Sequence, residues 1–136
     1  MCLLIATASY YAYVSNRIPL DWGSLGEHSS NMFTSLNQTD LHLQTHPEHG
    51  LSMYDNHSDG SGVCYASRLR PFMRMGPREE LWQYNADTHI TDWLEEQAIA
   101  FDVVTDDDLN EQGAALLNRY DCVMTTTHPE YYSKQM

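Results

Sequence analysis

The sequence predicts an α/β fold: a layered domain built on a parallel sheet. Short apolar runs of strand length occur at residues 2–7, 101–105 and 121–126. Apolar residues at helical spacing and helix-start signals accompany the later runs. Strands and helices that alternate in this way are typical of parallel sheets covered by helices.

The first half of the chain is predicted to be one strand followed by a long polar loop. The continuous apolar run Cys2–Thr7 is typical of a strand covered on both faces. Residues 15–62 show little periodicity and are rich in Ser, Asn, Asp, Gly and His, which predicts loop. Residues 68–80 are basic, carry two prolines and indicate a connector, so the loop extends over about 15–80. Loops of this length in compact domains are usually functional.

The second half alternates helices and strands. An amphipathic helix is predicted from about Ile90 to Ile99, followed by a strand at Phe101–Thr105. Asp106, Asp107 and Asp108 place carboxylates in the first turn of a second helix, where the helix dipole favours them. We expect that helix to bury four side chains, namely Leu109, Leu116, Leu117 and Tyr120.

The end of the chain is predicted to form one more strand and one more helix. The strand spans Asp121–Thr126. Thr127–Glu130 then opens a helix, with Pro129 at its first helical position, where proline is well tolerated.

Length and charge limit the class of protein. The 136 residues suffice for one core, so we expect a single domain over residues 1–136. A formal net charge of −12 repels phosphate backbones and anionic membranes, which argues against nucleic acid and membrane partners. The apolar N-terminal run is too short to span a bilayer and lacks the basic residues of a signal peptide.

The cysteines indicate a reducing compartment. Cys2, Cys64 and Cys122 are odd in number, lie far apart and form no C-x-x-C pair. This pattern argues against a disulfide framework and against a thiolate zinc site. We therefore expect a cytoplasmic protein.

Candidate site residues follow two of the predicted strands. His128 and Glu130 lie beyond the last strand, whereas Tyr10 and Tyr13 follow the first strand. In parallel sheets ligands bind outside the carboxyl ends of the strands. The residues alone leave two readings of His128 and Glu130 open: helix capping, or a metal ligand or general base beside a polarising histidine.

The polar segment Tyr54–Pro71 also admits more than one interpretation. It could be a turn closed by Asx hydrogen bonds, with Gly60 and Gly62 at positive φ. A calcium-binding EF-hand loop is disfavoured, because the segment lacks the glutamate that ends such a loop. A Ser-His-Asp site drawn from Ser58, His57 and Asp59 is disfavoured because sequence neighbours rarely face one another correctly.

Zinc chemistry has no recognised motif in this chain. Seven histidines are available as ligands, but none forms an H-E-x-x-H pair. The stretch His46-Pro47-Glu48-His49 matches no known zinc motif either.

Several segments, taken together, carry a family resemblance. The longest is Gly50–Val63 followed by Ser67–Pro71, and the others are Ala6–Tyr13, Asp92–Glu95, Asp102–Asp106 and Thr127–Tyr131. In this order they resemble the C-terminal domain of N,N-dimethylformamidase large subunits. The resemblance covers nearly the whole chain.

The resemblance implies a fold related to class I glutamine amidotransferase and flavodoxin-like domains, and a mononuclear Fe(III) site. It implies two tyrosinates and one carboxylate as ligands. At the matching positions these are Tyr13, Tyr54 and Glu130, with Tyr10 as the alternative to Tyr13. His128 would lie beside the metal and hydrogen-bond substrate or water, so His128 and Glu130 are the expected catalytic residues.

The implied ligands suit the implied metal. A phenol has a pKa of about 10 and is normally protonated at neutral pH. A hard, highly charged cation displaces that proton readily, so paired tyrosines suit Fe(III) better than Zn(II).

The implied activity is hydrolysis of the C–N bond of a small neutral amide, from dimethylformamide to dimethylamine and formate. The resemblance implies a small subunit and homo-oligomers as partners of the full-length protein. Their large subunits are several times longer, and this chain stops six residues after Glu130, so we expect a fragment with an incomplete sheet. The alternative from another class is a non-catalytic α/β binding module whose polar loop contacts a partner or a carbohydrate.

Overall fold

The computed structural model describes residues 1–13, 38–73, 75–76 and 81–136. The chain forms two compact units. The first unit comprises Met1–Tyr10 and Pro77–Met136, and the second comprises Tyr11–Gly76. The single domain expected from the sequence stays a prediction.

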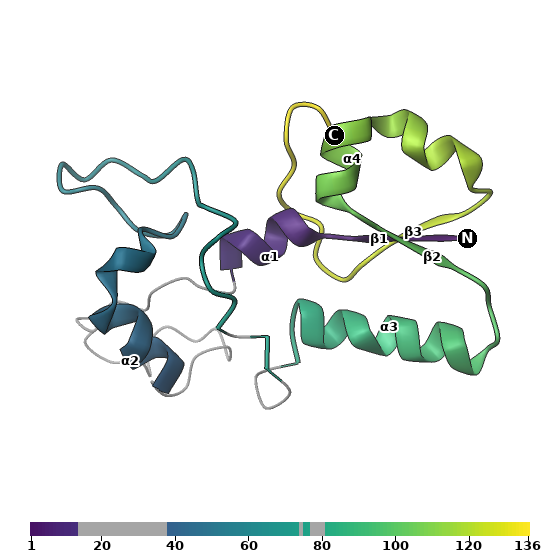
Figure 1. Ribbon diagram of the computed structural model, residues 1–136, viewed down its shortest axis with the longest axis horizontal. Coiled ribbons are helices and arrows are strands. Elements are labelled where there is room, and N and C mark those ends of the chain that lie inside the picture. The colour runs from purple at the N-terminus through teal and green to yellow at the C-terminus, as the bar shows by residue number, and fades with distance from the viewer. Residues whose placement is uncertain (14–37, 74, 77–80) are drawn as a thin grey trace. The chain divides into compact units, whose positions relative to one another are not determined.

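A parallel sheet forms the centre of the first unit (Figure 1). Strand β1 (Cys2–Ile5) lies in the middle and pairs with β2 (Asp102–Thr105) on one side and β3 (Val123–Thr125) on the other. Both pairings are parallel. The predicted α/β class with a parallel sheet is therefore confirmed, with three strands among the described residues. Each strand is shorter than its predicted apolar run.

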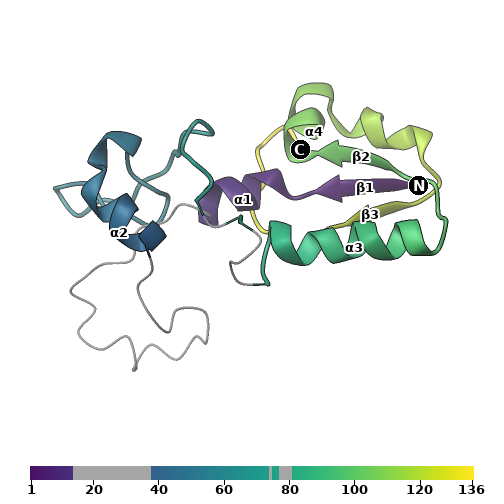
Figure 2. The same cartoon turned by 60° about the horizontal axis from the view of Figure 1, so that its bottom comes forward.

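Helices cover both faces of this sheet. Cys2 and Leu4 of β1 share one face, where they pack in an apolar cluster with Val104, Leu109 and Leu116. Leu3, which alternates with them, is also fully buried. Figures 1 and 2 show helix α3 (Tyr84–Glu96) and helix α4 (Asp106–Gln112) on opposite sides of the sheet. The strand β1 is thus covered on both faces, as its continuous apolar sequence predicts.

Helix α3 begins six residues before the predicted start at Ile90 and ends at Glu96. Its end is set by hydrogen bonds from the amides of Ala98 and Ile99 back to the carbonyls of Glu95 and Leu94. These two bonds are those of a Schellman motif, which needs a left-handed residue after the helix. Ala98 occupies that position with φ of 53°.

The predicted second helix is divided in two. Helix α4 ends at Gln112, and Gly113 follows with φ of 73° before the 3-10 helix η2 (Ala114–Arg119). Leu109 is therefore buried from α4 and Leu116 from η2, while Leu117 and Tyr120 are partly buried beside them. The start of α4 is as predicted: Thr105 and Asp108 form a capping box, and the bonds from Thr105 lower the pKa of Asp108.

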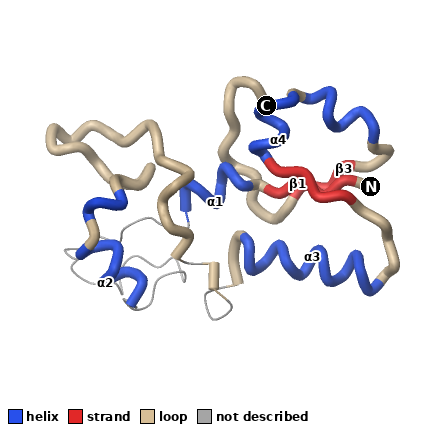
Figure 3. Tube along the Cα trace, in the orientation of Figure 1, coloured by secondary structure: helices blue, strands red, loops and turns tan. Residues whose placement is uncertain are grey.

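The predicted helix opening at Thr127–Glu130 is wrong, because residues 126–136 form no helix. Three backbone amides there donate to side chains of other segments. Thr127 donates to Asp87, and Glu130 and Tyr131 both donate to the hydroxyl of Ser9. Pro129 further disfavours helical backbone at the residue before it. Figure 3 shows this segment as loop.

Helical structure also lies within the region predicted to be loop. In the second unit, helix α2 (Gln38–Thr45) and the 3-10 helix η1 (Pro47–His49) interrupt the stretch 15–80. The sequence of α2 has no amphipathic repeat, so periodicity did not reveal it. Residues 14–37 of the predicted loop lie outside the described residues.

Helix α1 (Thr7–Tyr13) was not predicted, and its start follows β1 directly. The Thr7 hydroxyl donates to Asp107, and the Ala8 amide donates to Asp106, both at 3.0 Å. Two carboxylates at the end of β2 therefore complement the first turn of α1. Burial raises the pKa of Asp106 above its ordinary value.

A buried carboxylate links three segments at the carboxyl edge of the sheet. Asp87, in the first turn of α3, is 2% exposed. One carboxylate oxygen accepts the hydroxyl proton of Tyr10, and the other accepts the Thr127 amide at 2.8 Å. Burial and the hydrogen bond to Asp87 raise the pKa of Tyr10 well above its usual value. The segments after β1 and β3 are thus both tied to α3.

We predict that Tyr10→Phe lowers the free energy of unfolding at pH 7 by about 1.5–3 kcal/mol, because a buried carboxylate loses a donor. Tyr10 has a raised pKa in the folded protein, so its contribution is fully present below about pH 10 and is lost as the pH rises further. The variant should therefore show a flatter decline in stability above pH 10. Chemical denaturation at several pH values measures both effects, with the exposed Tyr65→Phe as control.

We predict that Ala98→Gly raises the free energy of unfolding by up to about 1 kcal/mol, because glycine adopts positive φ without a steric penalty. The matched control is Ala86→Gly inside α3, which should lower stability by about 0.5–1 kcal/mol. Urea denaturation of both variants compares them directly. Equal destabilisation by the two substitutions would contradict the Schellman end of α3.

Candidate functional site

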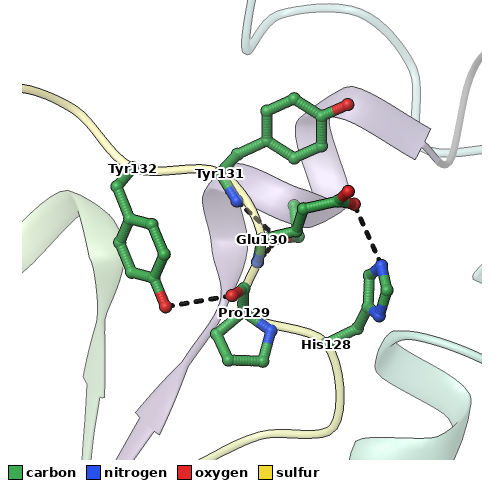
Figure 4. A network of polar contacts seen from close by, with 6 residues as sticks. His128, Pro129, Glu130, Tyr131 and Tyr132 are labelled. Atoms are coloured by element: carbon green, nitrogen blue, oxygen red, sulfur yellow. Dashed lines mark hydrogen bonds and ion pairs between the residues drawn. The ribbon is translucent and has the colours of Figure 1, made fainter.

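His128 and Glu130 form a polar pair after β3 in the first unit (Figure 4). The Nε2 atom of His128 lies 3.0 Å from Oε2 of Glu130. Their side chains are 40% and 49% exposed, so the pair contributes little to folding stability. The sequence-based capping reading fails, since no helix begins here.

Buried hydroxyl and ring groups hold this segment in place. The Oγ atom of Ser9, which is fully buried on α1, accepts the amides of Glu130 at 3.0 Å and Tyr131 at 3.3 Å. Figure 4 shows the Glu130 carboxylate turned toward the His128 ring. Ser9 gave no signal in the sequence, because its partner lies 121 residues away.

Two consecutive residues precede α3, and the first of them contacts this site. The ring of Trp82 lies 5.8 Å from that of His128, centroid to centroid, at an interplanar angle of 58°. Gln83 is 2% exposed, has φ of 52°, and its side-chain amide has no hydrogen-bond partner. Positive φ and an unsatisfied buried amide are both costly, and such costs cluster at functional sites. Neither residue was singled out from the sequence.

Two of the predicted metal ligands meet in the second unit. The rings of Tyr13 and Tyr54 stack with centroids 5.1 Å apart and an interplanar angle of 29°. Tyr13 ends helix α1, and Tyr54 comes from a turn 41 residues later, so tertiary structure brings the phenols together. Tyr54 keeps 46% of its surface exposed.

A tight turn fixes the backbone of Tyr54. The buried Ser52 accepts the Tyr54 amide through Oγ at 3.2 Å, and its own amide donates to the Asp55 carboxylate at 2.7 Å. The Asp55 amide in turn donates to the carbonyl of Ser52. These short-range bonds place Tyr54 at a defined position, which suits a residue that must present its side chain.

The tip of the polar segment is the Asx-type turn that the sequence allowed. Asp59 accepts both the amide and the hydroxyl of Ser61, at 3.0 and 2.7 Å, and these bonds lower the pKa of Asp59. Gly60 has φ of 83°, as predicted, whereas Gly62 is not among the glycines with positive φ. Asp59 is therefore committed to Ser61, which argues further against a Ser-His-Asp site.

Tyr10, the alternative to Tyr13, is in a different environment. It is 3% exposed and donates its hydroxyl proton to Asp87 in the first unit. A neighbouring carboxylate and burial both favour the neutral phenol over the tyrosinate. Tyr10 therefore fits a structural role better than a ligand role.

The three predicted ligands are divided between the two units. Tyr13 and Tyr54 belong to the second unit, and Glu130 belongs to the first. Their convergence on one metal ion stays a prediction. Within the part of the chain that the structure describes, no three His, Cys, Asp or Glu side chains gather in a way that could hold a metal ion.

Two further expectations concern the cysteines and the membrane. Cys2, Cys64 and Cys122 are all free thiols, as predicted. Burial raises the pKa of the Cys2 thiol. None of the helices in the described ranges is long and apolar enough to cross a membrane.

Comparison with known proteins places the chain in a family. All 136 residues match the family described as N,N-dimethylformamidase beta subunit-like, C-terminal. N,N-dimethylformamidase beta subunits of an Alcaligenes species and of Paracoccus aminophilus are each 39% identical to it over 135 residues. The match covers 95% of this chain and 18% of each relative, so the chain spans about a fifth of their length. The chain therefore belongs to the N,N-dimethylformamidase beta subunit-like, C-terminal family.

Proposed function

We propose that this chain supplies the metal-binding part of an amide hydrolase and that Tyr13, Tyr54 and Glu130 hold one ferric ion. The observation that carries the proposal is the stacked pair of Tyr13 and Tyr54. The stack brings together two phenol side chains from distant segments, and phenolate oxygens are hard donors that suit a highly charged cation. The family relationship supports the amidase part of the proposal, because the relatives are named as N,N-dimethylformamidase beta subunits.

The reaction proposed is hydrolysis of a small neutral amide such as dimethylformamide, which with one water gives formate and dimethylamine. Ferric iron would supply Lewis-acid polarisation of the carbonyl and would acidify water. A neutral substrate is not repelled by a chain of net charge −12. The same proposal includes a small partner subunit, homo-oligomers and a cytoplasmic location. It also includes a fold related to glutamine amidotransferase-like or flavodoxin-like domains.

We propose that His128 acts as a general base beside the Glu130 carboxylate. When its Nε2–H donates to Glu130 at 3.0 Å, the neutral ring keeps an acceptor lone pair on Nδ1. Such a ring can orient water and accept a proton from it. Ser9 holds the Glu130 backbone, and Trp82 packs near the His128 ring, so both groups are positioned before substrate binds.

We predict that the purified protein loaded with Fe(III) shows a visible tyrosinate-to-iron charge-transfer band. Tyr54→Phe and Tyr13→Phe should each remove most of the band, because each deletes one phenolate oxygen. Tyr65→Phe is the matched control, since Tyr65 is 90% exposed. Absorption spectroscopy with iron analysis makes the measurement.

A colourless protein that takes up no iron would overturn the iron assignment. Unchanged iron content in Tyr54→Phe and Glu130→Ala would favour the non-catalytic binding module instead. Loss of the band in Tyr65→Phe would place the site elsewhere in the polar segment.

We predict that His128→Gln lowers the rate of dimethylformamide hydrolysis, assayed with the partner subunit present, by about 100-fold or more, because a general base is removed. Iron content and the visible band should stay unchanged, since His128 is not a proposed ligand. His89→Gln, an exposed position on α3, is the control and should keep full activity. Wild-type rates in His128→Gln would remove His128 from the mechanism.

A further inference from the structure

Three histidines gather where α2 meets η1 in the second unit. His42 lies on α2, His46 follows its end, and His49 ends η1. The rings of His42 and His46 stack with centroids 3.8 Å apart, and the rings of His42 and His49 are 5.4 Å apart. The rings of His46 and His49 are 5.7 Å apart, so all three side chains contact one another although the backbone at His46 is not helical. All three are half-buried.

The closest contact in this cluster joins two ring nitrogens. Nε2 of His42 lies 3.2 Å from Nε2 of His49. Such a contact needs one ring to donate and the other to accept, so the two rings share one proton between them. Two protonated rings would repel each other at this distance. The two Nε2 atoms thus face each other, and imidazole in its neutral form binds metal ions through such a nitrogen.

The separation of the two nitrogens also suits a shared metal. Two nitrogens bound to one tetrahedral zinc at 2.0–2.1 Å lie roughly 3.3 Å apart. A modest ring rotation would aim both lone pairs at one point, and the donor ring would move its proton from Nε2 to Nδ1. Zinc, copper and nickel all accept imidazole ligands, whereas the proposed tyrosinate site favours a harder ion.

His46 is arranged to support His42. Its Nδ1 lies 2.8 Å from the carbonyl oxygen of His42 and 3.0 Å from the Thr45 hydroxyl. Since a carbonyl only accepts, Nδ1 of His46 carries the proton. With one nitrogen tied to the backbone of His42 and its ring stacked on the His42 ring, His46 restricts how far that ring can turn.

We propose that His42 and His49 bind one borderline divalent cation, such as Zn²⁺, through their Nε2 atoms. Water completes the coordination, since no third His, Cys, Asp or Glu among the described residues joins them in holding a metal ion. The bound ion joins α2 to η1 and stabilises this helical segment. This site uses none of the residues proposed for iron.

The test is a calorimetric titration of the iron-free protein with Zn²⁺ at pH 7.5. We expect one equivalent to bind. His42→Gln and His49→Gln should each weaken binding at least about tenfold, because even loss of a supporting residue costs that much. His57→Gln is the matched control, since it is exposed in the same unit. Binding should also weaken at pH 5.5, because protons compete for imidazole.

A second measurement needs no variant and covers the case in which a substitution unfolds the segment. In wild-type protein, Zn²⁺ should shift the side-chain ¹⁵N resonances of His42 and His49 and leave that of His57 in place. Absence of binding, binding that survives both substitutions, or shifts confined to other histidines would each overturn the proposal. The tyrosinate band of the iron-loaded protein should be unchanged in His42→Gln, so the two metal proposals fail independently.

Discussion

The arrangement of the first unit depends on Asp87, a buried carboxylate that is hydrogen-bonded through both of its oxygens. One oxygen of Asp87 accepts a hydrogen bond from the Tyr10 hydroxyl, and the other accepts one from the Thr127 amide. A buried charge without such partners would cost several kcal/mol, so each bond constrains the segment that supplies it. The segment after β1 and the segment after β3 are thereby held against the start of α3. His128 and Glu130 follow directly from the second of these anchored segments.

Sequence patterns predicted the elements whose stabilising contacts are local or periodic, and missed a segment that is held by distant residues. The strands could be predicted because β1 is covered on both faces, and its continuous apolar run records that burial. The start of α4 was predictable because Thr105 and Asp108 cap it within four residues. The absence of a helix after Thr127 was not predictable. It results from hydrogen bonds to Asp87, 40 residues from Thr127, and to Ser9, 121 residues from Glu130.

Helix boundaries were predicted wrongly for a different reason, because the missed helical segments lack an apolar periodicity. Helix α3 extends toward its N-terminus through polar residues, and one of them, Asp87, is buried because it has partners rather than because it is apolar. Helix α2 carries no apolar stripe, so periodicity had nothing to detect. For the candidate site, the grouping of Tyr13 with Tyr54 came from the family resemblance, and the role of the two residues as metal ligands stays a prediction. Composition and spacing alone could not have supplied it.

The proposed iron site rests on three ligands, Tyr13, Tyr54 and Glu130. Crystals of the iron-loaded protein, measured at the iron absorption edge, test this most directly, because anomalous scattering locates the metal itself. The account predicts one iron peak at bonding distance from both phenolate oxygens and the Glu130 carboxylate. An iron peak bound to other side chains, or none within reach of Tyr13 and Tyr54, would contradict it.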